Sequence, residues 1–407
     1  MYLLKTARHL SAFVLVSFVA GSAFALTPVK PKKHHKVHRV AAVGTAATAT
    51  VALASYTAPA TLVSAHAPVN HLSALQKRSS RSPWTSPTFA DSTEGDSVDG
   101  EDLMVRRAAV AALGPYNGSI VVVDPKTGRL LTIVNQKLAY QSGFQPCSTI
   151  KVVAALAGLN EGVINQNTKL KITKSHGMDL TEALAHSNNA FFSNVGYKLG
   201  YDRIIQYAQM FGLGEKAGLD LDQEQPGMLA AAPPADGVGM MTSFGEGIYM
   251  TPLELAAVIS TVANGGTLYY LQHPRSKEEI EQFIPRVKRQ LDIGQLVPEI
   301  RPGMQGAVEY GTARRAGYFA TDPIFGKTGT CTDGRSPTHL GWFGSFTETG
   351  DNKLVVVVLL TGGHAVSGPI ASGVAGAVYK NLSTENYFAQ AKPASPLALI
   401  SNQSCCN

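Results

Sequence analysis

The chain has 407 residues, of which 44% are hydrophobic and 16% charged, a composition typical of a globular protein with one large or two average domains. Its formal net charge of +6 is unevenly distributed: residues 1–90 hold ten Lys and Arg and no acidic residue, whereas the remainder carries a net charge of −4. A mildly acidic body lacks the basic face that nucleic-acid-binding proteins need, so we expect no nucleic-acid partner.

Residues 1–25 have the features of an export signal. Lys5 and Arg8 supply a positive start, residues 10–26 are uncharged, and the stretch from Ala23 to Ala25 offers a small-residue cleavage site. Because the uncharged run is at the lower limit for a membrane-spanning helix, an uncleaved anchor is the alternative to a cleaved signal peptide. Either one predicts export, to the periplasm or the extracytoplasmic face of the cell membrane.

Residues 26–99 predict a disordered tether, because they are basic, rich in Ala, Thr, Ser and Pro, and poor in the large apolar residues that offset the entropy of ordering. A solvated tether is the simplest interpretation of its basic cluster, and contact with an anionic membrane or envelope polymer is the alternative. Residues 391–407 predict a flexible C-terminal tail, in which Cys405 and Cys406 have no assigned role.

The body of the chain, residues 100–390, has a helix and strand-like runs at each end. A helix is predicted at 102–113 with Gly114 as its stop, followed by β-rich runs at 118–124 and 129–136. Asp124, Pro125 and Gly128 suit a hairpin turn between these runs, so the Lys-Thr-Gly triplet at 126–128 is predicted to be structural. Three more β-rich runs follow Gly326, and a helix is predicted at 369–383.

The middle of the body is rich in helical patterns. One helix has a clear start, with Thr251 as N-cap, Pro252 at the first helical position and Glu254 completing a capping box. This order predicts an α/β (α+β) fold in which an antiparallel sheet, built from the two ends of the body and flanked by helices, carries an inserted all-helical subdomain.

Ser148 and Lys151 lie one helical turn apart and therefore share a face. A serine hydroxyl is a poor nucleophile until a base removes its proton, and a lysine in a desolvated site can be that base because its pKa falls. The unpaired N–H groups of a first helical turn can also stabilise an oxyanion. By itself, however, Ser-x-x-Lys occurs by chance, usually as a solvated pair.

Two further motifs carry polar side chains. Ser187 and Asn189 directly precede an apolar helix and, alone, indicate an N-cap. A second Lys-Thr-Gly begins at Lys327, on a predicted strand, where a lysine and hydroxyls at a sheet edge can bind a carboxylate. Gly329 lets a ligand approach the backbone closely.

Ser-x-x-Lys, Ser-x-Asn and Lys-Thr-Gly in this order resemble the motif set of the penicillin-binding proteins and serine β-lactamases. The stretches "QPCSTIK", "YGTARRA" and "GKTGTCTD" are most similar to the transpeptidase domain of class B penicillin-binding proteins, and the resemblance covers residues 103–385. It implies a β-lactamase/transpeptidase-like fold and a peptidoglycan DD-transpeptidase. Such an enzyme acts on D-Ala-D-Ala stem peptides, is acylated by β-lactams and needs no metal or organic cofactor.

The resemblance also implies roles for individual residues. Ser148 would attack the penultimate D-Ala carbonyl, Lys151 would act as its general base, and Ser187 would relay the proton to the leaving group. The oxyanion hole would be formed by the backbone N–H groups of Ser148 and Thr330. The implied substrate-binding residues are Asn189, Lys327, Thr328, Gly329 and Thr330.

Two cysteines flank these motifs. Cys147 precedes Ser148, and Cys331 lies two residues after Gly329. In the resembling fold they lie beside one site, so the resemblance predicts a disulfide between them, which an oxidising compartment favours. Two buried free thiols are the alternative.

Other functions stay open. A serine β-lactamase needs a deacylating glutamate, and Glu224 lies at about the spacing of class A enzymes, although penicillin-binding proteins have a similar stretch and Asn188 stands where class A enzymes have aspartate. A DD-carboxypeptidase and a non-enzymatic β-lactam sensor are further alternatives. His186 either tunes the pH response of the site or is a packed neutral imidazole.

Overall fold

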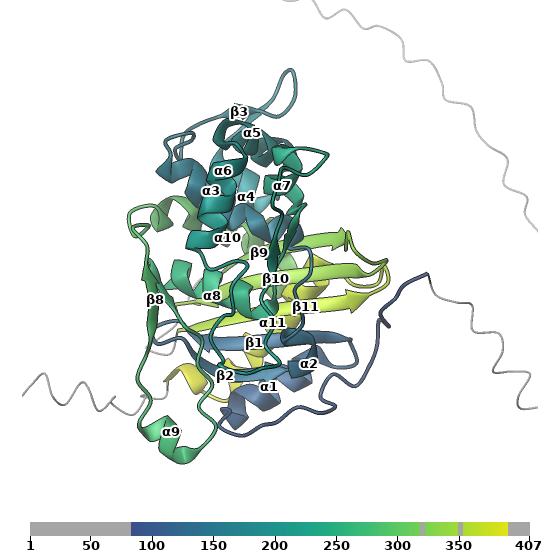
Figure 1. Ribbon diagram of the computed structural model, residues 1–407, viewed down its shortest axis with the longest axis vertical. Helices are drawn as coiled ribbons and strands as arrows, with labels where there is room; N and C mark the ends of the chain where they lie inside the picture. Colours follow the sequence, from purple (N-terminus) through teal and green to yellow (C-terminus); the bar gives the residue numbers. More distant parts are fainter. Residues whose placement is uncertain (1–82, 318–321, 349–352, 390–407) are drawn as a thin grey trace, which may run out of the picture. The chain divides into compact units, whose positions relative to one another are not determined.

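Five antiparallel strands form the central sheet, in the order β2-β1-β11-β10-β9 (Figure 1). The computed structural model describes residues 83–317, 322–348 and 353–389. Two strands come from the start of the body and three from its end, as the sequence predicted. The strands are β1 (Gly118–Asp124), β2 (Arg129–Val134), β9 (Ile324–Thr332), β10 (His339–Thr347) and β11 (Leu354–Gly362).

The turn between β1 and β2 confirms the prediction for the first Lys-Thr-Gly. The N–H of Gly128 donates to the carbonyl of Asp124 over 2.9 Å, and Gly128 has a φ of 73°, which glycine adopts without strain. Lys126 is exposed in this turn. The triplet therefore reverses the chain.

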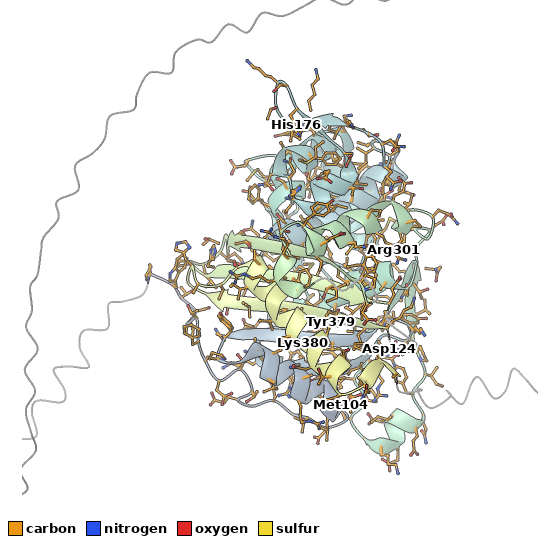
Figure 2. The ribbon with its side chains drawn as sticks, turned by 180° about the vertical axis from the view of Figure 1, so that it is seen from behind. Met104, Asp124, His176, Arg301, Tyr379 and Lys380 are labelled. Atoms are coloured by element: carbon orange, nitrogen blue, oxygen red, sulfur yellow. A yellow bond between two sulfur atoms is a disulfide. The ribbon has the colours of Figure 1, made fainter. Side chains whose placement is uncertain are left out.

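Both faces of the sheet are covered by helices. Ile120 and Val122 of β1 pack with α1 (Leu103–Leu113) and α11 (Gly368–Thr384) in one hydrophobic core, whereas Val121 and Val123 belong to a second core with α8 (Pro252–Ala263). Alternate residues of a strand face opposite sides, so a strand that is buried on both faces is a continuous apolar run. Figure 2 shows the α11 face, with Tyr379 and Lys380 on that helix.

The segment between β2 and β9 carries most of the remaining helices. They are α2 (Gln136–Ala139), α3 (Lys151–Asn160), α4 (Leu180–Ala185), α5 (Asn189–Leu199), α6 (Tyr201–Met210), α7 (Val238–Phe244), α9 (Lys277–Glu281) and α10 (Val297–Glu309). The capping box at Thr251 and Glu254 is present at the start of α8.

The sequence predicted an all-helical inserted subdomain, and this prediction is wrong in one respect. The inserted segment also contains three two-stranded ribbons, whose strands are too short to produce a recognisable alternation of apolar and polar residues. They pair β3 (Leu170–Lys171) with β4 (Gly177–Met178), β5 (Met228–Leu229) with β6 (Ile248–Tyr249), and β7 (Thr267–Tyr269) with β8 (Val287–Gln290). The β3–β4 ribbon lies at the far end of the helical segment, where His176 is labelled in Figure 2.

Residues 83–99 correct the predicted boundary of the tether, because they contact the body. The buried carboxylate of Asp96 lies 2.7 Å from a guanidinium nitrogen of Arg106 and accepts two backbone N–H groups at the start of α2. The ring of Trp84 packs edge-on against His364, with ring centroids 4.7 Å apart. Residues 83–99 are ordered by contacts with residues distant in the sequence. The composition of the segment does not reveal these partners.

Several predictions concern residues outside the described ranges: the export signal or anchor at 1–25, the tether up to residue 82, and the tail at 391–407. Among the described helices, none combines the length and apolar character needed to cross a lipid bilayer.

Asp96→Ala is expected to lower the free energy of unfolding by about 3 kcal/mol, because it leaves a buried guanidinium short of a partner and two N–H groups without an acceptor. Urea denaturation of the full chain measures this change. The control is Asp91→Ala, which removes an exposed carboxylate and is expected to leave stability nearly unchanged. Equal effects of the two substitutions would show that residues 83–99 do not pack on the body.

Candidate active site

Ser148 lies in a tight helical turn, η1 (Cys147–Ile150), that continues directly into α3. Cys147 has a φ of 51°, a left-handed conformation that is uncommon for a residue with a side chain. The turn leaves Ser148 partly exposed, whereas Cys147 before it and Lys151 after it are fully buried. The hydroxyl is thus the member of this turn that a substrate can reach.

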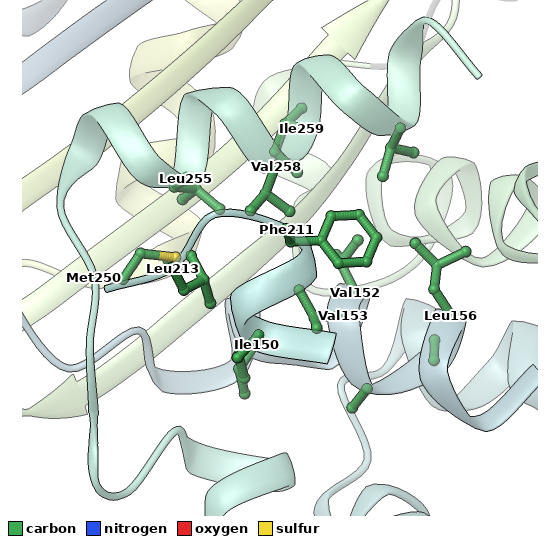
Figure 3. Close-up of a cluster of buried hydrophobic side chains, with 14 of the residues drawn as sticks. Ile150, Val152, Val153, Leu156, Phe211, Leu213, Met250, Leu255, Val258 and Ile259 are labelled. Carbon is green, nitrogen blue, oxygen red and sulfur yellow. The ribbon is translucent and has the colours of Figure 1, made fainter. Parts of the chain in front are cut away.

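Helix α3 is held by apolar packing along its length. Val152, Val153 and Leu156 belong to the core that also contains Phe211 and residues of α8, shown in Figure 3. Because interiors are close-packed, a helix buried on all sides has little freedom to shift. The core therefore determines where the Lys151 amine lies.

The amine of Lys151 contacts both serine motifs. Its Nζ lies 3.0 Å from Ser148 Oγ, 2.7 Å from the carbonyl oxygen of Ser187, 3.1 Å from Ser187 Oγ and 2.6 Å from Asn189 Oδ1. The structure thus brings together Ser-x-x-Lys and Ser-x-Asn, which are about forty residues apart.

This arrangement suits a neutral amine. A neutral lysine has two N–H donors and one lone pair, which match two nearby acceptors, Ser187 O and Asn189 Oδ1, and the Ser148 hydroxyl as a donor. The same hydroxyl lies 3.3 Å from the carbonyl of Ser243, which accepts its proton when the amine is charged. The geometry therefore allows Lys151 to take a proton from Ser148.

The side chain of Lys327 reaches the site from β9. Its Nζ donates to Ser187 Oγ over 2.8 Å and to the carbonyl of Thr328 over 3.0 Å. Ser187 therefore lies between two amines, 3.1 Å from that of Lys151. A hydroxyl in this position can pass a proton between them or onward to a leaving group.

Burial lowers the pKa of both lysines. Desolvation, followed by the charge of Lys327, lowers the pKa of Lys151 to about 6. Desolvation alone lowers the pKa of Lys327 to about 7. Both side chains are fully buried, and a charged amine loses its hydration there, so the neutral form is favoured near neutrality.

The N-cap of α5 differs from the prediction. It is Asn188, whose side chain accepts the backbone N–H of Phe191 over 2.8 Å, while Ser187 has a left-handed φ of 56° and Asn189 is the first helical residue. Capping by Asn188 leaves Ser187 and Asn189 free to face Lys151. Three polar residues in a row made this choice impossible from sequence.

Strand β9 approaches the nucleophile turn along the face that carries Lys327. A Cβ on Gly329 would lie 2.9 Å from the carbonyl oxygen of Pro146 and 3.2 Å from Cys147 Cβ, so any side chain there would push the strand away. Cys331, on the same face, forms a disulfide with Cys147, with Cα atoms 5.6 Å apart. The close approach and the disulfide together hold β9 beside Ser148.

The two threonines of the motif lie on the other face of β9, because strand side chains alternate. The hydroxyl of Thr328 pairs with that of Thr312 over 2.7 Å, and Thr330 Oγ1 accepts the N–H of Gly368 over 2.7 Å. Thr330 is exposed and its proton remains available to a carboxylate. Binding of a carboxylate by Thr328, Thr330 and Lys327 together stays a prediction.

Thr312 was missed by sequence reasoning, although "YGTARRA" was among the stretches that carried the resemblance. Its N–H donates to the carbonyl of Ala185 over 3.1 Å, and its hydroxyl meets Thr328. Thr312 thus connects the Ser187 loop to β9. The stretch does not indicate which neighbour Thr312 contacts, because that depends on the tertiary structure.

Two other residues named from the sequence have structural partners. The buried carboxylate of Glu224 accepts the backbone N–H groups of Ala217, Gly218 and Leu219, so it organises a loop. His186 is not a packed imidazole: its side chain is 48% exposed and lies 3.2 Å from Glu182.

Within the described ranges, no three His, Cys, Asp or Glu side chains gather closely enough to hold a metal ion. The polar groups around Ser148 are instead amines, hydroxyls and an amide. These groups can move protons and bind anions.

Replacing the Lys151 amine tests its burial. The pKa of the folded-state amine is below that of an unfolded lysine, so between these values the unfolded chain binds more protons and stability rises with pH. Lys151→Met is expected to raise the free energy of unfolding at pH 7 by about 2 kcal/mol and to reduce its increase between pH 7 and 10. Denaturant titrations at both pH values measure this, with exposed Lys126→Met as the control. A marked loss of stability in Lys151→Met would contradict the neutral buried amine.

Comparisons with known proteins identify the family of the chain. A family model described as the penicillin binding protein transpeptidase domain matches residues 118–383. Stage V sporulation protein D of Bacillus subtilis is 29% identical over 310 residues, which cover 65% of this chain and 47% of that protein. Peptidoglycan D,D-transpeptidase MrdA of Escherichia coli K12 is 25% identical over 295 residues, 56% of this chain and 46% of that protein.

The fold has a counterpart among solved structures. The crystal structure of the D,D-transpeptidase domain of a peptidoglycan glycosyltransferase from Eggerthella lenta matches with a TM-score of 0.58 and 21% identity, over 70% of this chain and 82% of that one. The chain spans about half the length of the curated relatives described above. Since the family model matches well over half of its residues, the chain belongs to the penicillin-binding-protein transpeptidase domain family.

Proposed function

We propose that this protein is a peptidoglycan DD-transpeptidase that forms an acyl-enzyme at Ser148 with D-Ala-D-Ala stem peptides, and that β-lactams acylate the same residue. The observation that carries the proposal is the position of the Lys151 amine, 3.0 Å from Ser148 Oγ and in contact with Ser187 and Asn189. The transpeptidase names of relatives support the reaction class.

In the proposed acylation, Lys151 takes the proton of Ser148 as Oγ bonds to the carbonyl carbon of the penultimate D-Ala. The C–N bond to the terminal D-Ala then breaks, and the proton passes to the departing amine through Ser187, which lies between the two amines. Thr330 is exposed, so its hydroxyl can donate to the substrate's carboxylate, as its proposed role requires. An amine from a second stem peptide finally displaces Ser148.

The proposed setting is extracytoplasmic. The basic N-terminal residues would act as an export signal or anchor followed by a tether, with the catalytic domain from about residue 83 to 390. We propose the same setting for the disulfide between Cys147 and Cys331, since oxidising compartments preserve such bonds.

A β-lactamase is the main alternative, and the position of Glu224 favours transpeptidation over it. Class A hydrolysis needs a carboxylate that activates water, whereas this one accepts three backbone N–H groups. The lifetime of the penicilloyl-enzyme discriminates the two functions. A lifetime of hours supports the transpeptidase, and turnover within seconds would make the protein a β-lactamase.

Covalent labelling by a fluorescent penicillin tests the nucleophile. Ser148→Ala is expected to abolish the labelled band, and Lys151→Ala to slow its appearance about a thousandfold, because the general base is lost. Lys126→Ala changes the lysine of the other Lys-Thr-Gly and is expected to label at the wild-type rate. Undiminished labelling of Ser148→Ala would overturn the proposal.

Thr312 is expected to position the hydroxyl of Thr328 for the substrate. Thr312→Val removes this hydrogen bond and is expected to slow acylation about tenfold, whereas Thr312→Ser, which keeps the hydroxyl, retains most of the rate. The control is Thr332→Val, further along β9. Stopped-flow or gel-based acylation rates measure all three, and equal rates for the Val and Ser variants at position 312 would refute this role.

A further inference from the structure

A carboxylate, an imidazole and a phenol meet beside Ser187. Glu182 Oε2 lies 3.2 Å from His186 Nε2, and the hydroxyl of Tyr310 donates to Glu182 Oε1 over 2.9 Å. The rings of His186 and Tyr310 lie 5.6 Å apart between centroids. The side chains of Glu182 and His186 are 43% and 48% exposed, so a second molecule can reach them. We call these three residues the rim cluster.

The rim cluster adjoins the acylation machinery on two sides. His186 is the C-cap of α4 and directly precedes Ser187, whose Oγ contacts both amines. Tyr310 is the C-cap of α10 and lies two residues before Thr312, which binds Ala185 through its N–H and Thr328 through its hydroxyl. The acylation step proposed above makes no use of this cluster.

The charges around the rim cluster favour a cation. Tyr310 remains a neutral donor, because burial, then its bond to Glu182, then the charges of Glu182, Glu309 and Asp179, raise its pKa to about 12. The ionised groups that act on Tyr310 in this way are all carboxylates. An imidazole paired with a carboxylate on one nitrogen can accept a proton on the other.

Transpeptidation requires an amine that arrives in the wrong protonation state. An aliphatic amine has a reference pKa near 10.4, so at neutral pH it is an ammonium, which has no lone pair for attack. The penicillin reaction needs no acceptor. A device for the acceptor would therefore be expected outside the groups that acylate Ser148. The rim cluster meets this condition, because it flanks Ser187 and Thr312, which contact Lys151 and Thr328.

We propose that the rim cluster binds the ammonium group of the acceptor peptide and removes its proton; this inference rests on the proposed function. Glu182 attracts the ammonium, and His186 takes one proton to become an imidazolium paired with Glu182. The neutral amine then bonds to the acyl carbon. Its second proton passes through Lys151 to Ser148 Oγ as the ester C–O bond breaks, and His186 releases its proton to solvent.

The partition of the acyl-enzyme between amine and water tests the inference. With a thioester of an acylated D-alanine as donor and Nα-acetyl-lysine as acceptor, the ratio of amide to hydrolysed product is measured at pH 8. Because both products come from one intermediate, the ratio is independent of the acylation rate and of the folded fraction. Glu182→Gln and His186→Gln are each expected to lower it about tenfold. Glu281→Gln, which removes an exposed carboxylate on α9, outside the rim cluster, is expected to leave it unchanged.

The pH profile separates proton removal from simple packing. Between pH 8 and 9, above the pKa of both buried lysines, the wild-type aminolysis rate is expected to be nearly constant, because His186 removes the proton from bound ammonium. In His186→Gln the rate is expected to rise about tenfold per pH unit, in step with the neutral amine in solution.

Unchanged ratios in Glu182→Gln and His186→Gln, with the acyl-enzyme still forming, would overturn the inference while leaving the proposed function intact. Parallel pH profiles for wild type and His186→Gln would also overturn it. If unmodified protein formed no acyl-enzyme with either thioester or penicillin, the proposed function itself would fail.

Discussion

The hydrogen bonding of one buried amine organises this site. Lys151 Nζ is the atom at which the nucleophile turn and the Ser187 loop converge, and its bonds to Asn189 Oδ1 and Ser187 O orient it toward Ser148. Without solvent to compensate, the amine keeps a depressed pKa and a lone pair near neutrality. Its reactivity therefore depends on the apolar packing that excludes water from α3.

The features that keep the amines of this site reactive lower the stability of the folded protein. Lys151 and Lys327 are both fully buried, and neither has a carboxylate partner among the ion pairs of the described residues. Cys147 and Ser187 both have left-handed backbones. Strain and desolvation of this kind persist where surrounding contacts over-determine the conformation. Here those contacts are the core behind α3, the Asn188 cap and the disulfide to β9.

The position of β9 at the edge of the sheet explains how one strand serves several partners. Its neighbour β10 pairs with it along its whole length, and its face that carries Lys327 approaches the nucleophile turn. Lys327 and Cys331 point to that turn, while Thr328 and Thr330 point to Thr312 and to the start of α11. The two faces of one strand thus divide between proton chemistry and carboxylate recognition in the proposed enzyme.

The local pattern by itself determined the five main strands, the capping box of α8 and the hairpin turn that makes the first Lys-Thr-Gly structural, because these depend on residues close together in the chain. The motif order determined the family. Tertiary structure alone decided that Asn188 caps α5, that Thr312 meets Thr328, that Glu224 holds a loop and that Asp96 orders residues 83–99. Each of these contacts depends on a choice between chemically equivalent partners or on a partner that folding brings near. The spacing of residues along the sequence does not contain their distances in the folded chain.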